Sequence, residues 1–164
     1  MSEESSKVNS FGLKVALFFT RVIAGASMIG LGLRLFIDGG WGAWNSIGVV
    51  LPTTYPRGPI GDIFLNFWGN QFVIQLLIWG AVLVGLSLVF GAFLRLGAYG
   101  GILIMLMLYL AVIPPASVIF NQHTIYIMVL AILAVSRAGE IGGIDSFIGD
   151  RLEERYPKLR YFLG

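Results

Sequence analysis

Residues 71–93 read QFVIQLLIWGAVLVGLSLVFGAF, an unbroken apolar stretch that carries no charged side chain. A helix needs about 20 such residues to cross the hydrocarbon core of a bilayer, because each residue advances it by about 1.5 Å. Three further stretches are long and mostly apolar, at about residues 11–37, 96–113 and 116–136, although the first of them carries three basic residues. Lipid offers no hydrogen-bond partner to an open backbone, so all four stretches must be helical. The sequence therefore predicts an all-α, integral membrane four-helix bundle.

The overall composition agrees with a membrane protein and excludes several classes of function. Of the 164 residues, 57% are hydrophobic and only 12% are charged, whereas soluble domains carry about 25% charged residues. The sequence contains no cysteine and one histidine, which excludes thiolate metal sites and iron–sulfur clusters. It also has no phosphate-binding loop and no dinucleotide fingerprint. We therefore expect neither a metal nor a flavin in this chain, and the net charge of +2 gives no reason to expect a nucleic-acid partner.

The lysines and arginines predict the orientation in the cell membrane. With the N-terminus inside, eight basic residues fall on the cytoplasmic side, while Arg57 and Arg34 fall on or near the outer side. Cytoplasmic loops carry such an excess of Lys and Arg. We therefore predict a multi-pass protein with both termini in the cytoplasm. Its parts are a polar N-terminus (1–10), a transmembrane domain (11–136) with a long outer loop (38–70), and a cytoplasmic tail (137–164).

Two segments outside the spans have the pattern of amphipathic helices. In the outer loop, apolar residues at helical spacing predict a short interfacial helix over residues 59–68, which would cap the bundle. In the tail, the apolar stripe of Ile144, Phe147, Ile148 and Leu152 lies among basic residues. That pattern predicts a surface helix that rests on anionic lipid head groups.

Small residues and a short break predict how the spans pack. Pairs at fourfold spacing, Ala26 with Gly30, Ala81 with Gly85 and Gly97 with Gly101, let helix backbones approach closely in lipid. Gly25 and Gly32 thin the first helix further. We expect the second and third spans to be separated at Leu94–Arg95.

Arg21 lies about ten residues inside the first predicted span. An arginine near the centre of a span costs about 2.5–3.5 kcal/mol on insertion scales, so it persists where it is paired, hydrated or useful. The interiors of the other three spans contain no acid, which leaves Gln75 and Asn121 as neutral candidate partners. A structural bond to another helix and a functional role both remain open for Arg21.

Arg34 is expected in the outer third of the bundle, near Arg57 and His123. With Asn121 beside them, these residues predict an electropositive pocket that could hold a dianion by forked guanidinium contacts. The alternative is an ordinary ion pair of Arg34 with Asp38, one helical turn further on.

Trp41, Trp44 and Trp68 are the aromatic candidates for cofactor binding, and Trp79 is a fourth ring of the same kind. Their rings could stack on a quinone. The alternative is an aromatic belt at the membrane–water boundary, where tryptophan is enriched for its amphipathic ring.

The sequence resembles the DoxX-like membrane proteins, and within them the DoxD subunits of thiosulfate:quinone oxidoreductases. The resemblance spans about residues 21–145. Its motifs are RVIAG at 21–25, GLR at 32–34, GAFLRLGA at 91–98 and SRAGEIGGID at 136–145.

This resemblance implies an oxidoreductase subunit that oxidises thiosulfate to tetrathionate and reduces a membrane quinone. It also implies a small second subunit resembling DoxA, and an association with terminal quinol oxidase complexes like those of sulfur-oxidising archaea. In that scheme Arg34, Arg57, His123 and Asn121 would bind thiosulfate, and Arg21 would position or polarise a quinone carbonyl. A non-catalytic anchoring subunit of a respiratory complex is the alternative, and a small anion channel is a third possibility.

Overall fold

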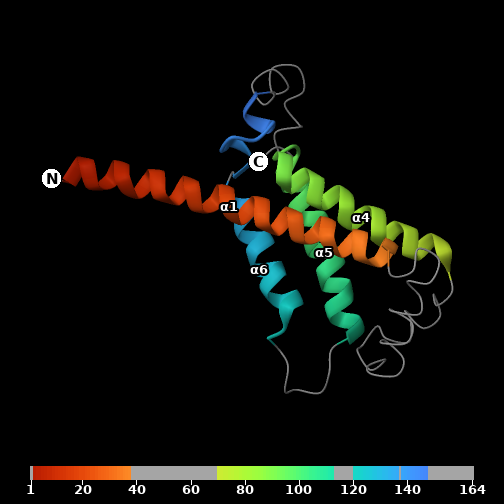
Figure 1. Cartoon of the computed structure of the whole chain (residues 1–164). Coiled ribbons are helices and arrows are strands. Elements are labelled where there is room, and N and C mark those ends of the chain that lie inside the picture. The colour runs from red at the N-terminus through yellow and green to blue at the C-terminus, as the bar shows by residue number, and fades with distance from the viewer. Residues whose placement is uncertain (1, 38–69, 113–119, 137, 148–164) are drawn as a thin grey trace.

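The computed structural model describes residues 2–37, 70–112, 120–136 and 138–147 (Figure 1). The described residues contain no strand, so the all-α prediction is confirmed for this part of the chain. Their α-helices are α1 (Ser2–Ile37), α4 (Gln71–Phe90), α5 (Leu94–Val112) and α6 (Gln122–Val135), and the 3-10 helix η2 (Ala138–Glu140) follows α6.

Two of these helices are long and apolar enough to cross a membrane. The stretches are Phe11–Ile37 within α1 and Phe72–Phe90 within α4. The apolar stretches Leu94–Leu110 of α5 and Gln122–Val135 of α6 are shorter. By length and composition, the structure therefore supports membrane association through two helices.

The first pair of helices, α1 and α4, runs antiparallel and side by side, while α5 and α6 form a second hairpin beside them (Figure 1). Glycines allow the close contact between α1 and α4. A Cβ added at Gly25 would lie 2.8 Å from the carbonyl oxygen of Gly85, and one at Gly32 would lie 2.8 Å from that of Ile78. The predicted pair of Ala26 and Gly30 is on a different face: Ala26 is exposed, and no heavy atom lies within 4 Å of a Cβ added at Gly30.

The predicted small pairs on α4 and α5 do lie at helix contacts. Ala81 is fully buried, and a Cβ added at Gly85 would lie 2.6 Å from the carbonyl oxygen of Gly25. A Cβ on Gly97 would collide with the Ser87 side chain, and one on Gly101 would lie 2.9 Å from Leu130.

The buried core runs along the inner faces of all four helices, and the outer faces carry large apolar side chains. Core residues include Met28, Leu88, Leu94, Leu130 and Leu133. Large exposed residues include Phe19, Ile23, Trp79, Leu83, Leu103 and Ile132. So many large exposed apolar side chains are unusual on a water-soluble monomer and indicate a surface that contacts lipid or another protein.

Several element boundaries differ from the sequence prediction. The break between the second and third helices lies at Gly91–Phe93 rather than at Leu94–Arg95, because Gly91 adopts φ +60° and ends α4 as a left-handed cap. The polar start of the chain belongs to α1, which begins at Ser2. The last helix begins at Gln122 rather than near 116, because Asn121 in extended conformation is its N-cap.

The predicted interfacial helix at 59–68 lies outside the described residues. So does most of the predicted tail helix, although the chain is helical from Asp145 to Phe147.

Candidate functional site

A polar cavity of about 280 Å³ lies where α1 ends and α6 begins. Arg34, in the last turn of α1, and His123, in the first turn of α6, both line it. Its remaining walls come from three helices: Ser27, Met28, Gly30 and Leu31 from α1, Met105 and Leu108 from α5, and Gln122 and Tyr126 from α6. The cavity thus combines a permanent cation, an imidazole, a carboxamide and a phenol.

The backbone at the start of α6 fixes the position of His123. The carboxamide oxygen of Asn121 accepts hydrogen bonds from the backbone N–H groups of His123, at 3.0 Å, and Thr124, at 3.2 Å. Asn121 therefore acts as a helix cap, which satisfies two of the free donors of the first turn. The Nδ1 atom of His123 is buried and has no hydrogen-bond partner within the described part of the chain. This atom is therefore an unsatisfied polar group of a residue that lines the cavity.

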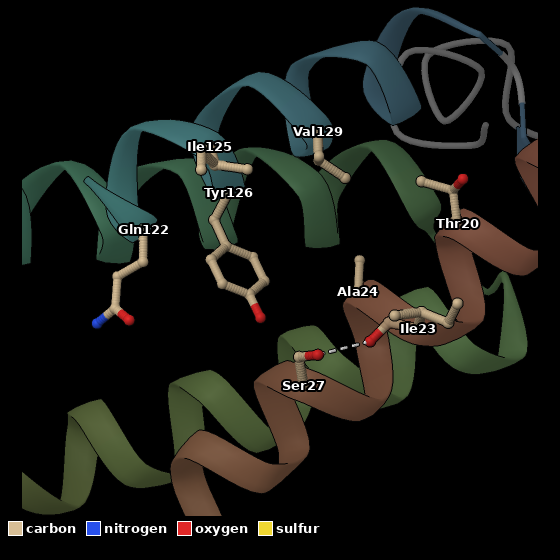
Figure 2. A pocket seen from close by; sticks show the side chains of 8 residues that line it. All are labelled: Thr20, Ile23, Ala24, Ser27, Gln122, Ile125, Tyr126 and Val129. Carbon is tan, nitrogen blue, oxygen red and sulfur yellow. Dashed lines mark hydrogen bonds between the residues drawn. The ribbon is translucent and has the colours of Figure 1, made fainter. Parts of the chain in front are cut away.

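A second, mostly apolar groove of about 380 Å³ lies between α1 and α6 (Figure 2). Its walls are Thr20, Ile23 and Ala24 on α1 and Ile125 and Val129 on α6. Three further residues, Ser27, Gln122 and Tyr126, line both this groove and the polar cavity. In Figure 2, Tyr126 extends from α6 toward α1, with its hydroxyl on the side of Ser27. The groove and the polar cavity are therefore neighbouring parts of one larger site.

Arg21 lies away from this site, at the other end of α6. Its side chain is buried, with 1% exposed, and lines neither the cavity nor the groove. Nη1 donates a 2.6 Å hydrogen bond to the carbonyl oxygen of Ala138, Nη2 donates to Gly142 at 3.5 Å, and the guanidinium carbon lies 5.2 Å from the ring centre of Phe18. Arg21 therefore holds the chain that leaves α6 against α1.

Asp145 supplies the acid that the sequence analysis did not find for Arg21. Its carboxylate is 2% exposed and interacts electrostatically with Arg21. The same carboxylate accepts hydrogen bonds from the backbone N–H groups of Phe93, at 2.8 Å, and Leu94, at 3.1 Å. Asp145 follows the fourth helix in the chain, so a search of the span interiors alone misses it.

The other two partners considered for Arg21 are engaged elsewhere. The side-chain oxygen of Gln75 accepts a 3.0 Å hydrogen bond from the indole of Trp79, on the same helix. Asn121 caps α6 at its opposite end. The contacts of Arg21 therefore support a structural role, in which it bonds to another part of the chain, over a functional one.

Of the residues predicted to form a site, the structure brings Arg34 and His123 to one cavity, and Asn121 adjoins it as the cap of α6. Arg57, Trp41, Trp44 and Trp68 lie outside the described residues. The sequence analysis did not single out Tyr126 or Ser27. Tyr126 lies one helical turn after His123, and Ser27 lies two turns before Arg34. This spacing places each of them on the same helix face as its predicted neighbour and could have identified them.

Comparison with protein-family models, curated proteins and solved structures finds no match to this chain.

Proposed function

We propose that this chain is a four-span subunit of the cell membrane that binds thiosulfate in the Arg34–His123 cavity and passes its electrons to a membrane quinone. The observation that carries the proposal is the meeting of Arg34 and His123, 89 positions apart in the sequence, on the wall of one polar cavity. The resemblance to DoxX-like proteins, and to DoxD in particular, supplies the choice of substrate. The DoxA-like subunit and the terminal quinol oxidase complex remain proposed partners.

The chemistry of the cavity suits an oxyanion. A guanidinium stays charged throughout the accessible pH range and can offer two parallel N–H donors to an anion. Nδ1 of His123 is without a partner among the described residues, so it can donate to a sulfonate oxygen when it carries a proton. Gln122 adds neutral donors on the same wall. Together these groups can offset the charge of thiosulfate.

The proposed reaction balances without a metal or flavin in this chain. Two thiosulfate ions join through their terminal sulfur atoms, so that one S–S bond forms and two electrons are released. One quinone takes those two electrons and two protons and becomes the quinol. Repulsion between two anions at about 4 Å reaches several kcal/mol at a protein-like dielectric, which a fixed cation at the site reduces.

The test is to replace Arg34 with Gln. This change removes the charge-assisted contacts, which contribute about 1.5–3 kcal/mol each, so we expect thiosulfate to bind roughly 10- to 100-fold more weakly. Binding of radiolabelled thiosulfate to the full chain in liposomes measures this directly, and thiosulfate-dependent quinone reduction in membranes should fall in parallel. Lys14→Gln, which removes a positive charge from an exposed position of the same helix, is the matched control. Unchanged binding in Arg34→Gln would remove this cavity from the mechanism.

A second candidate function is a non-catalytic subunit that anchors a respiratory complex. The observation in its favour is that Arg21, the residue expected to act on the quinone, bonds to carbonyl groups of its own chain. Purification separates the two functions: an anchor would co-purify with haem or copper proteins and would bind no thiosulfate in isolation.

A further inference from the structure

The groove between α1 and α6 combines an apolar wall with one polar end. Ile23, Ala24, Ile125 and Val129 form the wall, and Tyr126 stands at the polar end (Figure 2). The groove measures about 380 Å³ and adjoins the polar cavity of about 280 Å³. Sites for small organic ligands occupy about 300–1,000 Å³ and are mostly apolar with a few polar groups. The groove therefore has the size and the polarity of a site for an amphiphile.

The rim of the groove faces outward from the bundle. Ile23 on α1 is 63% exposed, and Ile125 on α6 is 60% exposed. In a membrane these side chains would contact acyl chains, so a ligand dissolved in the lipid could enter sideways without crossing an aqueous phase. This route suits a molecule with a long apolar chain.

The polar end offers hydrogen-bond donors. Ser27 donates its hydroxyl proton to the carbonyl oxygen of Ile23 at 2.9 Å, so its oxygen is left mainly as an acceptor. The phenol of Tyr126 and the carboxamide of Gln122 provide donors at the same end. A quinone ring carries two carbonyl oxygens that accept hydrogen bonds and is joined to an apolar chain.

We propose that this groove is the quinone site, with the isoprenoid chain along Ile23, Ala24, Ile125 and Val129 and one ring carbonyl held by Tyr126 and Gln122. The choice of quinone among amphiphiles rests on the proposed function. The location rests on the groove, and it differs from the tryptophan and Arg21 sites that the sequence analysis predicts. The ring would then lie beside the thiosulfate cavity, from which it takes two electrons, and two protons from the aqueous side complete the quinol.

Photolabelling with a short-chain azidoquinone tests the location in the absence of thiosulfate. The full chain in lipid nanodiscs is illuminated with the probe, and the labelled peptides are identified by mass spectrometry. We expect label on residues 20–27 and 122–129, and unlabelled quinone should compete for it. Label confined to other helices, or equal competition by a phospholipid at the same concentration, would overturn the proposal.

Two tryptophan variants of α6 provide a matched pair. Ile125→Trp fills the groove, whereas Ile132→Trp places the same side chain at a similarly exposed position (57%) that does not line it. We expect labelling to fall at least 10-fold in Ile125→Trp and to stay unchanged in Ile132→Trp. Tyr126→Phe, which removes one hydrogen bond with little change in volume, should weaken quinone binding about 3- to 10-fold. Equal losses in both tryptophan variants would contradict the groove.

The outcome for quinone can be separated from the outcome for thiosulfate. Label in the groove of a chain that binds no thiosulfate would uphold the quinone site and reject the proposed substrate. Thiosulfate-dependent quinone reduction by Ile125→Trp with an unchanged KM for quinone would uphold the substrate and reject the groove.

Discussion

Arg21 lies in a slot formed by two glycines. A Cβ added at Gly91 would lie 2.5 Å from Nη1 of Arg21, and one added at Gly143 would lie 2.8 Å from the same atom. Both glycines therefore leave room for the guanidinium, which reaches the carbonyl groups of Ala138 and Gly142 from this slot. Two nitrogens of this buried cation are satisfied in this way, whereas Nε is buried and has no hydrogen-bond partner among the described residues.

The backbone conformation of Gly91 also favours glycine, in addition to the space that Arg21 needs. Its φ of +60° lies in the left-handed region that side chains with a Cβ disfavour. We expect Gly91→Ala to lower the free energy of unfolding by about 1–3 kcal/mol, through backbone strain and displacement of Arg21. Thermal unfolding in detergent, followed by tryptophan fluorescence, measures the change.

The control for Gly91→Ala is Gly12→Ala on α1. No heavy atom lies within 4 Å of a Cβ added there, and alanine is the better helix former by about 1 kcal/mol. This variant should be neutral or more stable. A Gly91→Ala protein as stable as the control would show that Arg21 does not need the slot.

For single residues, the sequence shows which side chains are costly to bury in a membrane, but it does not show which residues they contact. Arg21 stands out because a cation inside a span is costly. Arg34 and His123 are expected at the same depth in the membrane, and the structure has both on the wall of one cavity. The partner of Arg21 is not predicted, because Asp145 lies beyond the last span and reaches it only through the turn after α6. The pairing depends on the tertiary path of the chain rather than on local pattern.

At the scale of elements, the segment after α6 satisfies the ends of two other helices. The backbone N–H groups of Ile144 and Asp145 donate to the carbonyl oxygens of Phe90 and Gly91, each at 2.9 Å. These carbonyls end α4 and would otherwise lack partners inside the helix. The Asp145 carboxylate accepts from the backbone N–H groups of Phe93, just before α5, and Leu94, its first residue. Residues 138–147 thus join α1, α4, α5 and α6 at one end of the bundle.

This junction predicts coupling between Arg21 and Asp145. Asp145→Asn removes the negative charge beside a buried guanidinium and turns one acceptor into a donor, so we expect a loss of about 2–4 kcal/mol of stability. Arg21→Met should also destabilise the protein. The double variant should lose less than the sum of the two, with an interaction energy of about 0.5–3 kcal/mol. Unfolding of all four proteins in the same detergent measures this cycle, and strictly additive losses would contradict the coupling.

Helix existence can be predicted from the sequence, whereas helix ends and contacts depend on local geometry. Length and apolar character predict all four helices. The break after α4 is misplaced by three residues, because it is determined by the left-handed Gly91 and by the backbone N–H groups that donate to the Asp145 carboxylate, rather than by the charged Arg95. Fourfold spacing likewise selects Gly30, whereas Gly25 and Gly32 make the contact with α4. The helix face turned to a neighbour is set by packing.

At the scale of the whole molecule, helix lengths differ from the thickness of a bilayer. The 36 residues of α1 extend about 54 Å, and its N-terminal part projects beyond the other helices (Figure 1). The 14 residues of α6 cover about 21 Å, less than the roughly 30 Å of hydrocarbon. Because α6 carries His123 and Tyr126, its crossing is the part of the four-span proposal that most needs a direct test.

The absence of cysteine from the chain makes that test simple. Single cysteines at Ser5, Phe120 and Phe147 mark the start of α1 and the two sides of α6; Phe120 and Phe147 are 79% and 80% exposed. With four spans and the N-terminus inside, a membrane-impermeant maleimide should label Phe120→Cys in intact cells, and the other two only after permeabilisation. If α1 and α4 alone crossed the membrane, Phe120→Cys would also require permeabilisation. Arg34, at the outer end of α1, and His123 would then lie on opposite sides of the membrane, so the Arg34–His123 cavity could not form and lateral entry of a quinone between α1 and α6 would lose its physical basis.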